Sequence, residues 1–87
     1  MTEDHMNTGL PVSGYKPQSD SSVALVNENK RLEEMILRRF DGLATIADDH
    51  PSYPLDVRWF AIARTHIEQG FMALNRAIFK PDRVKDI

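Results

Sequence analysis

The run RWFAIARTHIEQGFMALNRAIF, residues 58–79, decides the fold of this 87-residue chain. Its apolar side chains recur at three- and four-residue steps, which places them on one stripe of an α-helix. That stripe holds Phe60, Ala63, Ile67, Phe71 or Gly70, Leu74 and Ile78. A neighbouring stripe mixes apolar and hydrogen-bonding side chains, namely Trp59, Ile62, His66, Gln69, Ala73 and Arg76. Such a wide face predicts contact with more than one packing partner.

The ends of this helix, expected over residues 57–79, are marked by local signals. Asp56 is suited to cap the first free N–H groups, and Leu55 before it is placed to pack on Phe60. Pro81 ends the helix. Gly70 in its middle costs roughly 1 kcal/mol relative to alanine, which fits either a close approach by another helix or a tolerated glycine on a packed face.

A second helix is expected over about residues 22–47, after the start signal Asp20-Ser21-Ser22. Asn29 interrupts its apolar seam, which consists of Leu25, Leu32, Ile36, Phe40, Leu43 and Ile46 or Ala47. Residues 48–55 contain two prolines and continue neither helix. The sequence therefore predicts an all-α fold, an antiparallel two-helix hairpin.

A hairpin of this size needs further partners. A chain of 87 residues buries only about 60% of its unfolded surface. Several large apolar residues lie off both seams: Val23, Val26, Met35, Leu37, Trp59, Ile62 and Met72. We therefore expect a compact homo-oligomer with ligand sites between its subunits.

The segment before the hairpin is polar and has no helical or alternating period, so residues 1–13 are expected to form an extended or disordered tail and residues 14–87 the hairpin domain. Gly14-Tyr15-Lys16-Pro17 places an aromatic ring beside an ammonium group. Pro17 favours an extended Lys16, so Tyr15 is either presented outward or packed on the nearest helix.

Composition excludes several function classes. The net charge of −2 argues against binding of duplex nucleic acid, and no apolar run reaches the roughly 20 residues of a membrane span. Without cysteine, nothing indicates an oxidising compartment, and a cytoplasmic location fits. No catalytic motif is present, so no catalytic residue or cofactor is expected. Asp48, Asp49 and His50 indicate a solvated turn rather than a metal site, and His66 a hydrogen-bonding interface residue.

Binding of an anionic ligand is the better supported hypothesis. Arg58, Arg64 and Arg76 lie on the second helix, and the planar guanidinium donates two parallel hydrogen bonds to phosphate. Aromatic residues near such cations are suited to stack on bases. The first helix adds basic residues that are also within reach of carboxylates in ordinary ion pairs; they are Lys30, Arg31, Arg38 and Arg39, near Glu28, Glu33, Glu34 and Asp41.

Three segments together resemble the small phage anti-CBASS cyclic-oligonucleotide sponge family, whose helical hairpin is shared with anti-Thoeris sponges for a cyclic ADP-ribose isomer. The segments are Gly14-Tyr15-Lys16-Pro17, then Leu25-Val26-Asn27-Glu28-Asn29-Lys30, then residues 58–65 running into Gly70-Phe71-Met72-Ala73-Leu74-Asn75-Arg76-Ala77. The resemblance covers roughly residues 14–80.

The resemblance implies a non-enzymatic antagonist of immunity in the host bacterial cytoplasm, built as a hexamer of hairpins. It would hold cyclic dinucleotides such as cGAMP, and in some relatives cyclic trinucleotides in separate threefold pockets, without cleaving them. By motif position, Tyr15 and Lys30 resemble the pair that stacks on dinucleotide bases, with Lys16 adjacent. Arg64 resembles an arginine that contacts phosphate in the trinucleotide pockets, with Arg58 and Arg76 as alternatives. A sponge for a cyclic ADP-ribose isomer and an adaptor hairpin that binds a host protein remain as alternative functions.

Overall fold

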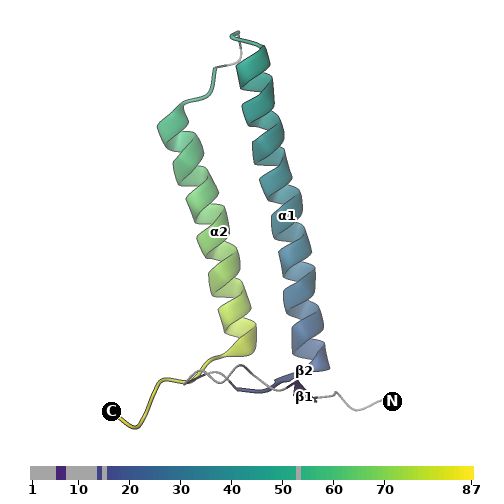
Figure 1. The fold of residues 1–87 in the computed structure, drawn as a ribbon, viewed down its shortest axis with the longest axis vertical. Coiled ribbons are helices and arrows are strands. Elements are labelled where there is room, and N and C mark those ends of the chain that lie inside the picture. The colour runs from purple at the N-terminus through teal and green to yellow at the C-terminus, as the bar shows by residue number, and fades with distance from the viewer. Residues whose placement is uncertain (1–5, 8–13, 15, 53) are drawn as a thin grey trace.

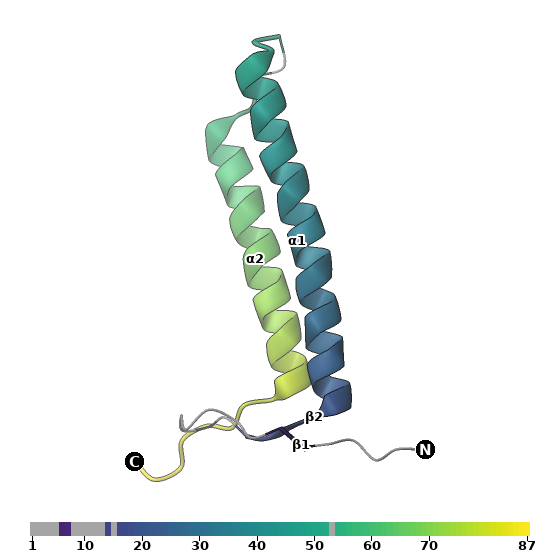
Figure 2. The ribbon, with the colours of Figure 1, turned by 45° about the vertical axis from the view of Figure 1, so that its right-hand side comes forward.

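The computed structural model describes residues 6–7, 14, 16–52 and 54–87. Its main elements are two helices, α1 (Asp20–Asp49) and α2 (Val57–Phe79). They lie side by side and antiparallel, joined by a turn at one end, as Figures 1 and 2 both show. The prediction of an all-α hairpin is therefore confirmed. Neither helix of the described chain is both long enough and apolar enough to cross a membrane.

Two very short strands lie at the end of the hairpin opposite the turn. Strand β1 (Met6–Asn7) pairs antiparallel with β2 (Gln18–Ser19), with Met6 opposite Ser19. Of the tail expected over residues 1–13, β1 is the part that the structure describes. The segment after α2 runs past this same end of the molecule (Figure 1).

Helix α1 begins two residues earlier than expected because Ser19 is its cap. The Ser19 hydroxyl oxygen accepts a hydrogen bond from the Ser22 backbone N–H at 3.1 Å, and Ser19 itself has extended backbone angles. At the other end, the His50 backbone N–H donates to the Ile46 carbonyl at 2.9 Å, and Pro51 follows. The helix therefore reaches Asp49 rather than Ala47.

Helix α2 has the ends that its sequence predicts. The Asp56 carboxylate accepts a hydrogen bond from the Trp59 backbone N–H at 3.0 Å, which confirms Asp56 as the cap. Lys80 adopts a left-handed conformation with φ of 47°, and its N–H donates to the Arg76 carbonyl at 2.7 Å. Pro81 follows directly, and the helix ends at Phe79.

The contact between the helices contains both polar and aromatic pairs. The Asn29 side-chain amide donates to the Asn75 amide oxygen at 3.1 Å across the hairpin. Nearer the turn, the rings of Phe40 and Phe60 lie 5.2 Å apart at an angle of 43°. Such a partly buried amide pair favours one register of the two helices, because sliding either helix would leave its polar groups unpaired.

The predicted seam of α1 is wrong in its N-terminal half. Leu25 and Leu32 are 56% and 45% exposed, whereas Val26 is the one buried apolar residue of the described chain, at 5%. Apolar residues flank Asn29 on both sides of the helix, so the period alone does not decide which side faces α2. The hairpin turns the Val26 side inward, and Leu37, also expected off the seam, is half-buried.

The seam of α2 needs a similar correction. Leu74 is 47% exposed and Ala63 is exposed, while Asn75 is half-buried opposite Asn29. Of the alternatives at the middle of the helix, Phe71 is half-buried and Gly70 is exposed. An added Cβ at Gly70 would meet nothing within 4 Å, so no described part of the hairpin approaches this glycine closely.

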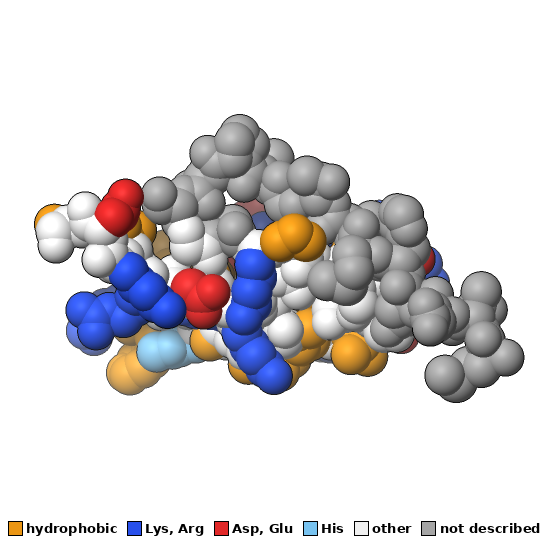
Figure 3. Space-filling model, turned by 90° about the horizontal axis from the view of Figure 1, so that it is seen from below, with side chains coloured by type: hydrophobic (Ala, Val, Ile, Leu, Met, Phe, Trp, Pro, Cys, Tyr) orange, Lys and Arg blue, Asp and Glu red, His pale blue; other side chains and the backbone are white. Residues whose placement is uncertain are grey.

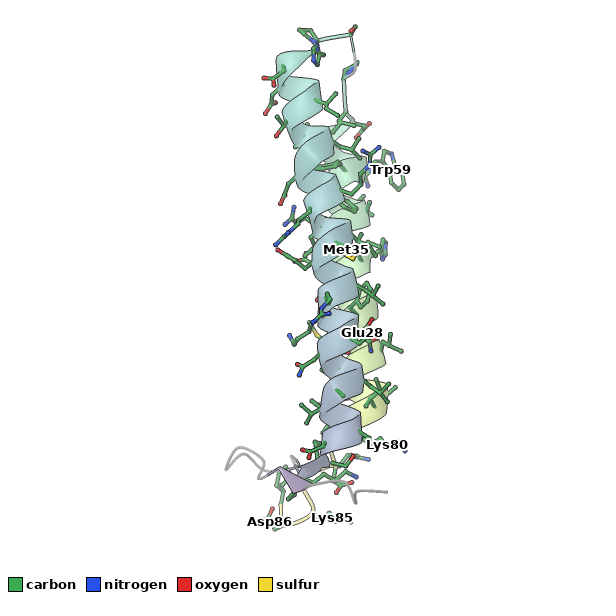
Figure 4. The ribbon with its side chains drawn as sticks, turned by 90° about the vertical axis from the view of Figure 1, so that its right-hand side faces the viewer. Glu28, Met35, Trp59, Lys80, Lys85 and Asp86 are labelled. Atoms are coloured by element: carbon green, nitrogen blue, oxygen red, sulfur yellow. The ribbon has the colours of Figure 1, made fainter. Side chains whose placement is uncertain are left out.

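Much apolar surface remains outside the contact of the two helices. Met35, Trp59 and Met72 are 64%, 61% and 68% exposed. Trp59 projects from α2 beyond the edge of the hairpin (Figure 4). With one buried apolar side chain among the described residues, the hairpin by itself provides little hydrophobic stabilisation.

Candidate ligand-binding site

The loop that precedes α1 is held against the segment that follows α2. The Asp82 backbone N–H donates to the Gly14 carbonyl at 2.6 Å. Gly14 has a φ of 88°, a backbone angle that is unfavourable for residues with a side chain. A Cβ added at this position would collide with the Asp82 carbonyl oxygen. Position 14 therefore needs glycine for both its backbone angle and its close neighbour. Tyr15, the predicted stacking residue, lies outside the described residues.

Charged and polar side chains reinforce this docking. Lys16 Nζ lies 3.8 Å from an Asp82 carboxylate oxygen, and both side chains are largely exposed. The Gln18 amide nitrogen donates to the Phe79 carbonyl at 2.9 Å and to the Lys16 carbonyl at 3.2 Å. Figure 3 views this end of the molecule and shows lysine or arginine and acidic side chains next to each other. Lys16 is thus part of an ion pair in the described structure.

Lys30 lies well away from Lys16 within one chain. It is exposed on α1, ten residues after the helix start, which corresponds to a rise of about 15 Å. A single hairpin therefore does not bring the two lysines together. This separation is compatible with a site in which Lys30 and the loop around Lys16 come from different copies of the chain.

Arg64 takes part in a contact between the helices. Its Nη1 atom lies 3.0 Å from a carboxylate oxygen of Asp41 on α1, and the side chains are 39% and 66% exposed. The sequence placed Asp41 among the partners of basic residues on its own helix, but it pairs with α2 instead. Arg38 does pair with Glu34 along α1, at 3.5 Å.

The two alternative arginines have different surroundings. The Arg58 guanidinium carbon lies 5.6 Å from the centre of the Trp59 ring, a cation–π distance on an exposed part of α2. Arg76 borders a surface hollow of about 430 Å³ whose other lining residues are Gln69, Met72, Ala73, Asn75, Phe79 and Pro81. Arg58, Arg64 and Arg76 therefore do not converge on one pocket of the hairpin.

The sequence did not indicate which residues form hydrogen bonds or ion pairs with the predicted site residues. Gln18 and Asp82 fix the loop before α1, and Asp41 fixes Arg64. No sequence motif points to them, because each contact joins segments far apart in the chain. Among the described residues, no group of three or more histidine, aspartate or glutamate side chains is placed to hold a metal ion.

Comparison with protein families gives one result. The family model described as "Acb2/Tad1, hairpin domain" matches residues 9–79, which include both helices and the loop that precedes α1. A search of curated proteins finds no significant match.

Proposed function

The chain belongs to the Acb2/Tad1 hairpin family of anti-CBASS and anti-Thoeris sponge proteins, and on this basis we propose that it binds and sequesters cyclic oligonucleotide immune signals. Domains of this family are generally non-catalytic. In the proposed role the protein cleaves nothing; it lowers the free concentration of a signal in the host bacterial cytoplasm so that CBASS effectors stay inactive. The match over residues 9–79 is the observation that carries this proposal.

The proposed assembly is a homohexamer of hairpins. Its support is the apolar surface that two helices leave open, since Met35, Trp59 and Met72 are each more than half exposed. A small domain with so little buried core is commonly stabilised by oligomerisation, which covers such side chains. The separation of Lys30 from the loop at Lys16 also favours a ligand site shared by subunits.

Within this assembly, we assign cyclic dinucleotides to a site formed by Tyr15, Lys16 and Lys30. A cyclic dinucleotide has two bases and two phosphates related by approximate symmetry, so a twofold pair of subunits offers one aromatic residue and one cation to each half. Arg64 is the proposed phosphate ligand for a cyclic trinucleotide, with Arg58 and Arg76 as alternatives. Residues 14–87 then form the sponge domain, preceded by the tail 1–13.

A cyclic ADP-ribose isomer is the second candidate ligand, because the matched family covers anti-Thoeris as well as anti-CBASS proteins. Both ligands combine phosphates with purine bases, so the same residue types suit both.

Melting curves with 3′,3′-cGAMP, cyclic triadenylate and a cyclic ADP-ribose isomer separate these ligands. The proposed function predicts a concentration-dependent rise in melting temperature with at least one of them. Chromatography after denaturation then tests for release of the intact nucleotide, since an enzyme would have consumed it. No shift with any nucleotide, together with retention of a host protein, would support the adaptor function instead.

A further inference from the structure

Asp41 and Arg64 form a link between the two helices whose geometry leaves part of the arginine available. Arg64 Nη1 contacts Asp41 at 3.0 Å, and no other described side chain pairs with this guanidinium. Guanidinium has five N–H donors. The edge formed by Nε and Nη2, which can donate two parallel hydrogen bonds to a phosphate, is not used by Asp41.

The position of the Asp41–Arg64 pair also favours a single orientation of the Arg64 side chain. Arg64 is anchored on α2 one helical turn after Phe60, and Asp41 follows Phe40 directly on α1. The two phenylalanine rings, in contact at 5.2 Å, pack the helices together next to the ion pair. Arg64 is only 39% exposed, whereas Arg38, paired within one helix, is 77% exposed.

From this geometry we propose that Asp41 is a positioning residue for anion binding by Arg64. It holds Nη1 and directs the free Nε–Nη2 edge toward solvent, where a phosphate group of the ligand is bound. The proposal rests on the sponge function proposed above and adds Asp41, which neither the family match nor the sequence indicates. It concerns the phosphate group and not the base.

Asp41 has two opposing effects on an anionic ligand. Its contact immobilises a side chain with many rotamers before the ligand arrives, which strengthens binding. Its negative charge also repels phosphate, which weakens binding. Two substitutions separate these effects. Asp41→Asn keeps an oxygen that accepts from Nη1 and removes the charge, whereas Asp41→Ala removes both.

The first experiment measures binding of cyclic triadenylate by titration calorimetry to the full chain. We expect Asp41→Ala to weaken binding by roughly 2- to 12-fold, the factor that corresponds to one immobilised side chain. Asp41→Asn should bind at least as tightly as the parent. In the Arg64→Ala background, Asp41→Ala should not weaken binding, because the repulsion of phosphate is then the one effect of Asp41 that the substitution removes. Glu34→Gln, which breaks the ion pair with Arg38, is the matched control and should bind like the parent.

Equal weakening by Asp41→Asn and Asp41→Ala would overturn the proposal, because it would show that the position of Nη1 is irrelevant. The same holds if Asp41→Ala weakens binding in the Arg64→Ala background, since Asp41 would then act without Arg64.

A second measurement tests whether Asp41 positions Arg64 even if the parent binds no cyclic nucleotide and the proposed function fails. The Arg64 Nε–Hε signal is followed by NMR in the free protein and during titration with inorganic pyrophosphate. We expect this group to be ordered in the parent and in Asp41→Asn, mobile in Asp41→Ala, and shifted by pyrophosphate at several-fold lower concentration in the parent than in Asp41→Ala. Equal mobility, or equal response to pyrophosphate, in parent and Asp41→Ala would contradict the positioning role.

Discussion

Substitution of Gly14 by alanine tests the loop that carries the predicted stacking residue. The new Cβ would meet the Asp82 carbonyl oxygen, and an alanine at a φ of 88° is itself strained. Left-handed backbone costs an L-residue roughly 1–2 kcal/mol, before the steric overlap is added. Both colliding groups belong to the backbone or are fixed to it, so no side-chain rotation relieves the contact.

The interactions that would resist this strain are similar in size to the backbone cost alone, so the steric overlap decides the outcome. The Asp82-to-Gly14 hydrogen bond contributes about 0.5–1.5 kcal/mol, and the exposed Lys16–Asp82 pair up to about 1 kcal/mol. We therefore expect Gly14→Ala to release the loop from the segment after α2. The helices do not depend on this contact, so the melting temperature should change little.

Three measurements on Gly14→Ala check this chain of reasoning. Hydrogen exchange at the Asp82 amide should become faster, binding of 3′,3′-cGAMP should weaken, and the melting temperature should stay close to that of the parent. Gly42→Ala is the matched control, because its added Cβ meets nothing within 4 Å. A protected Asp82 amide and the affinity of the parent in Gly14→Ala would show that strain at position 14 does not release the loop.

Three further predictions concern the assembly and its sites. Gly70→Ala should stabilise an isolated hairpin by roughly 1 kcal/mol, because the added Cβ enters open space. If a second subunit packs against Gly70, the same substitution should instead lower the melting temperature. Melting curves together with the oligomer size from light scattering distinguish these two outcomes. Asn75→Ala leaves Asn29 without its partner and should cost about 1–3 kcal/mol in the free energy of unfolding, measured in urea; full stability would show that the amide pair is dispensable. Tyr15→Ala and Lys30→Ala should each weaken cyclic dinucleotide binding, by roughly 5- to 150-fold per base stack lost, while cyclic triadenylate binding stays unchanged. Loss of both ligands together would contradict separate sites.

The fold could be predicted from the sequence because its signals are local. Asp56 caps α2 through a residue three positions away, and Pro81 ends it from two residues beyond. The rotation of α1 about its axis was predicted less well. Apolar side chains flank Asn29 on both sides, and the side that faces α2 depends on how the two helices meet, which is not encoded in the period of either one.

In the candidate site, too, local motifs were predicted from the sequence and contacts between distant segments were not. The resemblance of short motifs led to Lys16, Lys30 and the arginines, but the partners of Lys16 and Arg64 come from distant segments. The ion pair with Asp41 also bears on the stability of the proposed ligand-free oligomer. Three copies of an unpaired Arg64 around a threefold axis would repel one another, and Arg64→Ala would then stabilise the ligand-free oligomer. Because each guanidinium is paired with a carboxylate, we expect no such stabilisation from Arg64→Ala.

Native mass spectrometry of the full chain after incubation with 3′,3′-cGAMP and cyclic triadenylate tests the central claim most directly, since it reports assembly, stoichiometry and the state of the ligand together. A sponge predicts six chains of 10.0 kDa each, carrying intact nucleotides whose masses are recovered unchanged when the complex is dissociated. Chains that carry no nucleotide of any type in the ligand panel, or that return cleaved products, would contradict it.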